Sequence, residues 1–465
     1  MRASVVPPIA WVTQSTGDSA ARAVDAGRAL RSSLSRGQQA AWRPSRGRPD
    51  PVDLLRQSDA GRLVDLLPIR YGRMLQNPFT FYRGAAAIMA CDLACCPVSG
   101  IRAQICGDCH LLNFGGFGTP ENRFVFDVND FDETTLGAWE WDIKRLVTSV
   151  IIAAQHLSFH QSDIRASALQ CVRAYREQIR NYATMGVLDV WYARLDESKL
   201  AAIVCSARER RQYAAAIKKA KSDSRDHAFP RLAADVHGDV KIVDAPPLLY
   251  HPPNVKPFLE MVARTFAAYR ETLPEDRKVL FDRFTLRDAA YKIVGVGSVG
   301  TRCLIAFFTD ARDDSLLLQM KEARRSVFET YAGAPADQSH GERVVTGQRA
   351  LQAASDLFLG FARADDGHDY YIRQSRDMKT SADVDHMSAR ALRDYAEFCG
   401  WALARAHAKA SGCAAMVAGY IGRSSVFDEA ILEFAQAYAT QNERDYEMLV
   451  DAVRRGQVNA KPSTE

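Results

Sequence analysis

Two distant segments of the chain combine residue types that suit phosphate chemistry. In the first, CGDCHLLNFG, Asp108 and Asn113 stand in the spacing D-x-x-x-x-N directly after the apolar run GIRAQI. Phosphoryl transfer uses this spacing, because the Asp orients an attacking hydroxyl while the Asn reaches a metal ion. We therefore expect Asp108 to be catalytic and Asn113 to bind metal. His110, inside the loop, is a candidate base or metal ligand, or a partner that orients Asp108.

An acidic cluster follows on the next apolar segment, FDVNDFDE. A strand that ends in carboxylates can present oxygen ligands to Mg²⁺, the ion that bridges nucleotide phosphates. Asp130 has the better local context and Asp127 the more usual distance from Asn113. We prefer Asp130 as the metal ligand and keep Asp127 as the alternative. A hairpin with solvated turn residues is the simpler interpretation of an isolated acidic cluster.

The second segment, VGVGSVGTRCLIAFF, contains the spacing G-x-G-x-x-G. Gly295, Gly297, Ser298 and Gly300 would form a hairpin tip where the backbone approaches phosphates closely. Lys321 follows on the next β-prone run, where kinases keep a lysine for the α- and β-phosphates. A dinucleotide-binding fold would instead need a helix after the third glycine.

The lysine needs an acidic partner on the following helix. Glu342, in GERVVTGQR, is the candidate by distance along the chain, and a solvated acid in the first helical turn is the alternative. These residues together predict a site for ATP and Mg²⁺.

Two further motifs are weaker evidence of a functional site. Cys106 and Cys109 have the spacing of half a zinc knuckle, but no second pair completes it, so we expect buried, reduced thiols. The literal HGD at His237–Asp239 lacks an Asn five residues after the Asp, and we interpret it as a surface loop.

Composition limits the class of protein. With 465 residues the chain is long enough for two lobes, and its 47% hydrophobic and 25% charged residues are ordinary for a globular protein. A net charge of +4 gives no reason to expect nucleic acid as a partner. No apolar run is long enough to span a membrane, so we expect a cytoplasmic protein whose partners are a nucleotide and an unidentified acceptor.

The elements that must position these residues divide the chain into four parts. Residues 1–50 have few large apolar residues and predict a flexible tail. Helical periodicity predicts a helical lobe over 51–280 that carries the catalytic and metal loops, and β-prone runs predict a nucleotide-binding lobe over 281–380, with three antiparallel strands around the glycines and Lys321. Helices over 381–465 would return to the helical lobe. The fold class is α+β.

The chain resembles the uncharacterised bacterial family called domain of unknown function 2252 in seven segments: FYRGAAA, GDCHLLNFG, FDVNDFDE, WEWDIKRL, VGVGSVGTRC, ERVVTGQR and GWALARAHA. The resemblance extends from about Val52 to about Tyr446. The family is similar to the protein-kinase-like and aminoglycoside-phosphotransferase-like superfamily, which implies a two-lobed kinase-like fold. It also implies that Asp142, in WEWDIKRL, braces the backbone of the catalytic loop.

The chain departs from that superfamily in two ways. Cys106 stands where the catalytic loop usually has histidine, and the loop precedes the glycine segment instead of following it. A circular permutation would explain this order, because two lobes with separate cores can be rejoined at the surface. The expected activity is phosphoryl transfer from ATP to a hydroxyl. The alternatives are nucleotidyl (AMP) transfer, a nucleotide-binding pseudokinase and, from GDCH, a metallophosphoesterase.

Overall fold

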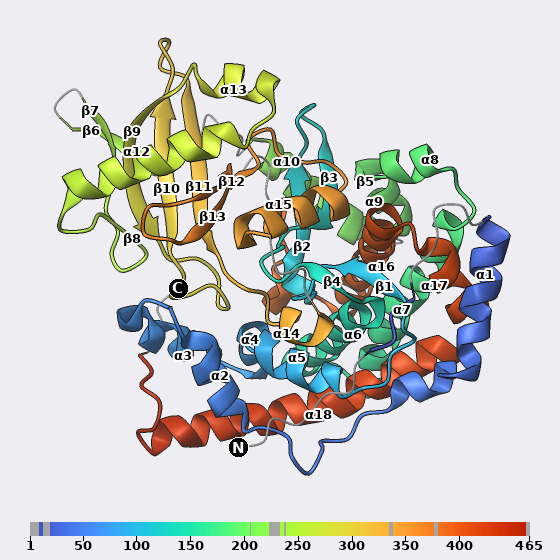
Figure 1. The fold of residues 1–465 in the computed structure, drawn as a ribbon. Helices are drawn as coiled ribbons and strands as arrows, with labels where there is room; N and C mark the ends of the chain where they lie inside the picture. Colours follow the sequence, from blue (N-terminus) through green and yellow to red (C-terminus); the bar gives the residue numbers. More distant parts are fainter. Residues whose placement is uncertain are drawn as a thin grey trace.

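The protein has a mixed α+β architecture in which small antiparallel sheets lie beside a large helical body (Figure 1). The computed structural model describes residues 9–12, 19–204, 206–222, 233–236, 239–333, 338–375 and 380–461. Within these residues, no helix is long and apolar enough to cross a membrane.

The helices of the described chain include short 3₁₀ segments between longer α-helices. They are α1 (Ala20–Ala29), η1 (Leu30–Ser32), η2 (Arg36–Ala40), α2 (Pro51–Asp59), η3 (Val64–Leu66), α3 (Leu67–Met74), α4 (Pro78–Gly84), α5 (Ala86–Ala94), η4 (Leu111–Asn113), α6 (Trp139–His156), α7 (Gln161–Tyr182), α8 (Val187–Tyr192), α9 (Glu197–Ile203), α10 (Ala207–Ser222), α12 (Val255–Glu271), α13 (Glu275–Phe281), α14 (Glu329–Ala332), α15 (His340–Leu351), η5 (Val384–His386), α16 (Ala389–Ser411), α17 (Ala414–Ile421) and α18 (Val426–Arg454).

The largest sheet has six antiparallel strands in the order β12-β13-β11-β10-β9-β8. Its strands are β8 (Leu249–Tyr250), β9 (Thr285–Lys292), β10 (Cys303–Thr309), β11 (Ser315–Ala323), β12 (Gly360–Arg363) and β13 (Asp369–Gln374). The prediction of three antiparallel strands around the glycine segment is confirmed by β9, β10 and β11. β11 lies between β10 and β13, so both of its backbone edges are paired within the sheet.

Two helices, α12 and α13, pack against this sheet. α12 lies across one face of it (Figure 1), where Phe266 and Tyr269 pack with Phe281 and Phe308 in one apolar cluster. The sheet region therefore begins before residue 281, because the apolar face of α12 packs against the sheet and α13.

The helical body is built around α6 and α7 and is closed by α16, α17 and α18, which come from the C-terminal end of the chain. The helices predicted over 381–465 are present as α16, α17 and α18. α16 runs against α7, and Gly400 is the reason they approach closely. A Cβ at Gly400 would stand 2.2 Å from the Cys171 carbonyl oxygen.

The expectation of a flexible tail is wrong for residues 19–50. α1 packs against α17 through two glycines, since a Cβ at Gly27 would stand 1.9 Å from Met416 O and one at Gly419 would stand 2.1 Å from Val24 O. Further along, Arg48 forms ion pairs with Asp92 of α5 and Asp445 of α18. A search for large apolar residues misses this segment, because it packs through small residues and buried ion pairs.

Two smaller sheets carry the loops that sequence analysis singled out. The four-stranded sheet has the order β14-β2-β3-β5, and a two-stranded sheet pairs β1 with β4. Their strands are β1 (Arg102–Ile105), β2 (Phe114–Gly118), β3 (Phe124–Val128), β4 (Thr135–Ala138), β5 (Leu195–Asp196) and β14 (Thr380–Ser381).

A separate hairpin pairs β6 (Ala233–Val236) with β7 (Asp239–Ile242). Asp239 of the literal HGD begins β7, whereas His237 and Gly238 lie outside the described residues.

Candidate active site

The loop that contains Asp108 is fixed by a carboxylate from helix α6. Asp142 Oδ2 accepts a hydrogen bond from the Cys106 amide at 2.7 Å, and Oδ1 accepts one from the Gly107 amide at 2.9 Å. Gly107 has φ +82°, and a Cβ there would stand 2.3 Å from Glu133 O, so the turn requires glycine. The predicted bracing role of Asp142 is confirmed.

A second layer of hydrogen bonds holds Asp142 itself. His407 Nε2 of α16 lies 3.1 Å from Asp142 Oδ2, and the Tyr175 hydroxyl of α7 lies 2.8 Å from His407 Nδ1. All three side chains are buried. The loop therefore takes its position from three helices of the body.

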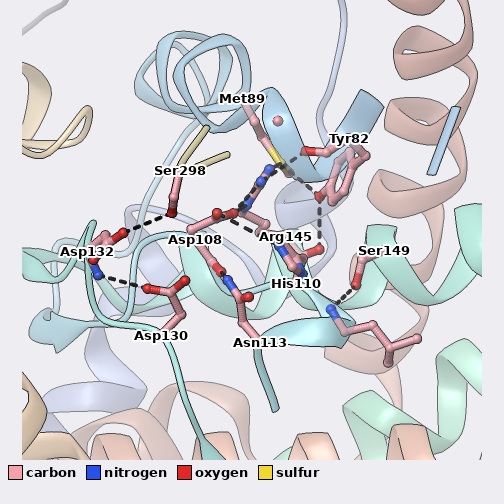
Figure 2. A network of polar contacts seen from close by, with 12 residues as sticks. Tyr82, Met89, Asp108, His110, Asn113, Asp130, Asp132, Arg145, Ser149 and Ser298 are labelled. Carbon is pink, nitrogen blue, oxygen red and sulfur yellow. Dashed lines mark hydrogen bonds and ion pairs between the residues drawn. The ribbon is translucent and has the colours of Figure 1, made fainter. Parts of the chain in front are cut away.

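Asp108 is held on one side and open on the other. Arg145, also on α6, donates to Asp108 Oδ1 from Nε at 2.7 Å and again from Nη2. The Arg145 side chain is buried against the Tyr82 ring, with 4.5 Å from its Cζ to the ring centroid. The Asp108 side chain keeps 20% of its surface exposed, and Asp130, Asp132 and Ser298 lie beside it in Figure 2. Arg145 thus fixes the carboxylate and leaves Oδ2 toward the cavity.

His110 is buried and neutral. Its Nε2 lies 3.8 Å from Asp108 Oδ2, and it is 4% exposed. Burial lowers the pKa of His110 to about 4, although the charge of Asp108 acts in the opposite direction. At neutral pH the ring carries no charge, and a group with this pKa is a weak base. At 3.8 Å from Asp108 Oδ2 the ring is too far away for a hydrogen bond, so a role in orienting Asp108 stays a prediction.

Asn113 is tied to the same loop. Its Nδ2 donates to the Asp108 carbonyl oxygen at 2.7 Å, and its own carbonyl accepts from the Asn129 amide at 2.8 Å. The second of these bonds joins the loop that contains Asp108 to the start of the acidic segment. The hydrogen bond from Nδ2 fixes the amide, and Oδ1, its acceptor atom, is the one that can bind a cation.

Asp127 is excluded from the candidate metal site by its surroundings. Its side chain is fully buried, and both carboxylate oxygens lie 2.8–2.9 Å from Arg405 Nη2 of α16. Oδ2 also accepts from the Ala353 amide at 2.7 Å. The carboxylate is thus used to join β3, α16 and the end of α15, and the alternative that favoured it as a metal ligand is wrong for this conformation.

Asp130 and Asp132 lie at the cavity beside Asp108 (Figure 2). Asp130 Oδ1 accepts from the Asp132 amide at 3.2 Å, so the two residues form a tight turn after β3. Asp132 forms an ion pair with Lys321 Nζ, accepts from the Tyr371 hydroxyl at 2.8 Å and lies 3.4 Å from Ser298 Oγ. The residue that links the acidic segment to the lysine and to the glycine segment is therefore Asp132.

Lys321 is a buried cation in the middle of the sheet. It lies on β11 opposite Cys303 of β10 and Tyr371 of β13, and it is 3% exposed. Burial alone would lower the pKa of Lys321, but the charges of Asp132 and Asp130 help to raise it well above its ordinary value. The lysine is charged and directed at the acidic segment.

Glu342 does not contact Lys321. It stands in the first turn of α15, where its amide donates to the N-cap hydroxyl of Ser339 at 3.1 Å. Its neighbour Arg343 makes the connection instead: Nη2 donates to Asp132 O at 2.8 Å and to Arg324 O at 2.6 Å, and Nη1 donates to Thr134 O. The assignment of Glu342 as the lysine's partner is wrong, because α15 turns Arg343 toward the acidic loop.

The glycine segment folds as a compact turn between β9 and β10. Gly295 has φ +65° and Gly300 has φ +90°, conformations that favour glycine. Gly300 O accepts from the Leu63 amide at 2.8 Å, and Gly297 lies against the backbone of Arg83, with 3.3 Å between an added Cβ and Arg83 O. The turn is held against the segment around α2–α4 and brings Ser298 to Asp132.

Two adjoining cavities open around these residues and share Asp130, Gly295 and Ser298. The arginine-lined cavity, about 310 Å³, is bordered by Asp108, His110 and Asn113 and by the arginines Arg62, Arg70, Arg83, Arg324 and Arg325. The lysine-lined cavity, about 300 Å³, is bordered by Lys292, Lys321 and Arg373. The structure thus brings every residue expected in the site except Asp127 and Glu342 to one of these cavities or, for Gly300, to the turn beside them.

The cysteines of the loop are buried thiols. Cys106 and Cys109 lie near Asp142 with possible ligand atoms within 4.8 Å of one another. Burial helps to raise the pKa of Cys106 to about 11, against a hydrogen bond with Cys109 that lowers it. Asp142 already accepts from two loop amides and contacts His407, which accounts for its burial without a metal ion.

Three residues at this site had no assigned role from the sequence. Arg145 stands three residues after Asp142, one helical turn away, and this spacing could have identified it. Asp132 lies inside the acidic cluster, but its pairing with Lys321 depends on how the sheet meets the helical body. Arg343 carries no local signal, since a helix-borne arginine is usually solvated.

A family model described as "Uncharacterized protein conserved in bacteria (DUF2252)" matches residues 62–452. Neither a curated protein nor a solved structure matches the chain significantly.

Proposed function

The protein belongs to the uncharacterised bacterial family DUF2252, and we propose that it is an ATP- and Mg²⁺-dependent phosphotransferase of kinase-like type that acts on a hydroxyl acceptor. One observation carries the proposal. Asp108, Asn113 and Asp130 come from one end of the chain, the glycine segment and Lys321 come from the middle, and all of them border two adjoining cavities. This is the set of groups that phosphoryl transfer requires.

The oxygen atoms at the centre fit Mg²⁺. Asn113 offers Oδ1, because its Nδ2 is engaged with Asp108 O, and Asp130 offers a carboxylate at the junction of the two cavities. Mg²⁺ binds through one or two such oxygen ligands together with phosphate oxygens. When bound, the ion would offset negative charge on the phosphates.

The lysine-lined cavity suits the nucleotide phosphates. Lys321 supplies a buried positive charge, and Gly295 borders the cavity with a backbone free of Cβ. In this conformation Asp132 neutralises Lys321. Phosphate oxygens would compete with Asp132 for the lysine, so nucleotide binding would shift that ion pair.

Asp108 suits the role of orienting the acceptor hydroxyl. Arg145 occupies Oδ1, and Oδ2 is the oxygen left to accept a hydrogen bond from a hydroxyl in the cavity. Asp142 and Arg145 both come from α6, so one helix sets the loop and its carboxylate together.

The order of the elements supports kinase-like lobes in permuted sequence order. The six-stranded sheet region lies in the chain between α10 and α16, and α16 returns to the catalytic loop through His407 and Tyr395. The Tyr395 hydroxyl donates to Phe114 O at 2.9 Å, directly after the loop. A circular permutation of a two-lobed kinase would give this order.

Labelled ATP tests the proposal. Purified protein is incubated with Mg²⁺ and ATP labelled on either the α- or the γ-phosphate, with and without candidate hydroxyl acceptors, and released ADP and AMP are separated. We expect γ-label transfer with release of ADP, and a loss of roughly 10²–10⁴-fold in Asp108→Asn. Asp276→Asn, an exposed aspartate on α13 that pairs with Arg277, is the matched control and should retain activity.

Other outcomes would identify the rival activities. Transfer of α-label would replace phosphoryl transfer with nucleotidyl transfer. Binding of Mg²⁺-ATP that leaves both labels on the nucleotide under every acceptor condition would indicate a pseudokinase.

A further inference from the structure

Five arginines and five carboxylates border the arginine-lined cavity, and three of the arginines lie close together. Three guanidinium groups gather around residues 58–60: Arg62 Nε and Arg324 Nη1 donate to Ser58 O at 3.2 and 3.3 Å, and Arg70 Nη2 donates to Ser58 Oγ at 3.4 Å. Among the described residues, Asp59 is the one carboxylate in ion-pair distance of these three groups, 2.9 Å from Arg70 and 3.9 Å from Arg62. Arg324 bonds to main-chain oxygens instead.

These charges are largely removed from water. The side chains of Arg62 and Arg70 are 10% and 2% exposed. Burial, followed by repulsion from Arg70 and Arg324, lowers the pKa of Arg62 to about 9, which is unusual for a guanidinium. Placing like charges together in a sheltered pocket is costly unless an anion joins them.

The arginine cluster and the two lysines border different cavities. Lys292, Lys321 and Arg373 border the lysine-lined cavity, on the far side of Gly295 and Ser298 from the arginine cluster. The nucleotide phosphates therefore have cations of their own. The arginine-lined cavity contains Asp108 and is bordered in addition by Arg325, whose side chain is 63% exposed and whose Nε lies 3.4 Å from Glu329 Oε2.

We propose that the acceptor is a small hydroxyl compound that itself carries an anionic group, a phosphate or a carboxylate, bound by Arg62, Arg324 and Arg325. This identification of the substrate class rests on the proposed phosphotransferase activity. Arginine presents a planar fork that matches phosphate and carboxylate oxygens in pairs. Arg62 Nη2 and Arg324 Nε are not used in the bonds to residues 58–60 and Val299.

With such an acceptor, phosphoryl transfer needs only ATP, the acceptor hydroxyl and Asp108. The acceptor oxygen forms a bond to the γ-phosphorus while the bond from that phosphorus to the β–γ bridging oxygen breaks. The electron pair of the broken bond leaves with ADP, and the hydroxyl proton passes to Asp108. The anionic group stays at the arginines and holds the hydroxyl in place.

Calorimetric titration with simple anions tests the site. The protein is first saturated with Mg²⁺ and a non-hydrolysable ATP analogue, so that the nucleotide site is filled, and is then titrated separately with inorganic phosphate and with acetate. We expect binding of at least one anion, weakened tenfold or more in the double variant Arg324→Gln/Arg325→Gln. Arg165→Gln, a surface arginine on α7 that pairs with Glu429, is the control and should bind as the wild type does. The tighter anion identifies the acceptor's group as phosphate or carboxylate.

The outcomes separate this inference from the proposed function. Absence of binding for both anions, or equal binding in the double variant, would overturn the anionic acceptor. If the double variant no longer binds the ATP analogue, the arginines serve the nucleotide, and this result would also overturn the proposal of an anionic acceptor. Arginine-dependent anion binding in a protein that binds no Mg²⁺-nucleotide would contradict the phosphotransferase and keep the anion site. If the double variant unfolds, Arg325→Gln alone, at an exposed side chain, serves the same comparison.

Discussion

At the scale of single residues, the Asp108 carboxylate borders the arginine-lined cavity, and polar groups behind it hold both the carboxylate and its loop. Arg145 and Asp142 fix the loop through charge-assisted hydrogen bonds, which are stronger than neutral ones. His110 stands beside Asp108 as a neutral ring. The charge at the cavity therefore comes from carboxylates and arginines, and none of it comes from histidine at neutral pH.

The buried state of His110 predicts a pH dependence of stability. Its folded pKa of about 4 lies below the ordinary value of 6.5, so the unfolded chain binds the extra proton between these values and the free energy of unfolding falls as pH falls. Between pH 7 and pH 5 the loss from this residue is about 2 kcal/mol. Urea unfolding at both pH values should show that His110→Gln loses less stability than the wild type by that amount. An equal loss in both proteins would contradict a neutral, buried His110.

Spacing along the sequence predicted part of this site and could not predict the rest. Spacing within short segments singled out four candidates, because residues close in sequence share a loop or adjacent strands: Asp108, Asn113, Asp130 and Lys321. The partner of Lys321 could not be identified, since Asp132 reaches it only after the sheet and the helical body meet. Similarly, the burial of Asp127 depends on Arg405, 278 positions later in the chain.

At the scale of elements, α15 connects the sheet to the acidic loop. Arg343 donates to three main-chain oxygens, those of Asp132, Thr134 and Arg324, and its Nε lies 2.9 Å from Glu329 Oε1. Gly347 of the same helix allows close contact with the loop, because a Cβ there would stand 2.4 Å from the Thr134 side chain. The acidic loop is thereby held by the helix that follows the lysine strand.

This contact predicts different effects for two neighbouring residues on α15. Arg343→Lys keeps the charge but cannot reach all three carbonyls with a planar fork, so we expect a loss of about 1–3 kcal/mol in the free energy of unfolding and weaker Mg²⁺-ATP binding. Glu342→Gln should change either quantity little, within about 0.5 kcal/mol of the wild type. Denaturant unfolding and calorimetry measure both effects. A larger effect of Glu342→Gln than of Arg343→Lys would restore Glu342 as the functional acid.

The period of apolar residues predicted where helices and strands form more reliably than it predicted how they pack together. The strands β9–β11 and the helices α15, α16 and α18 follow from clear periodicity. The role of α1 was not predictable from hydrophobicity, because Gly27 and Gly419 act through what they lack, a Cβ at a close contact between helices. α12 shows an apolar face in the sequence, but the sequence does not say which lobe covers it.

At the scale of the whole molecule, the N-terminal segment and the C-terminal helices close the helical body around the loop that contains Asp108. Arg48 joins the N-terminal segment to α5 and α18; both acids are buried, and the Arg48 side chain is 10% exposed. Opposite the body, the six-stranded sheet presents Lys321 and the glycine segment toward the acidic loop. The candidate site thus lies where these two parts meet, and it is complete only when both are present.

Binding of Mg²⁺-ATP is the measurement that tests this account most directly. Calorimetry on the wild type should detect binding that requires Mg²⁺, and Asp130→Asn and Lys321→Met should each weaken it at least tenfold. Lys256→Met, at an exposed position on α12, is the matched control and should bind as the wild type does. A wild-type protein that binds no Mg²⁺-ATP, or variants at Asp130 and Lys321 that bind it unchanged, would contradict the central claim that these distant residues form one nucleotide site.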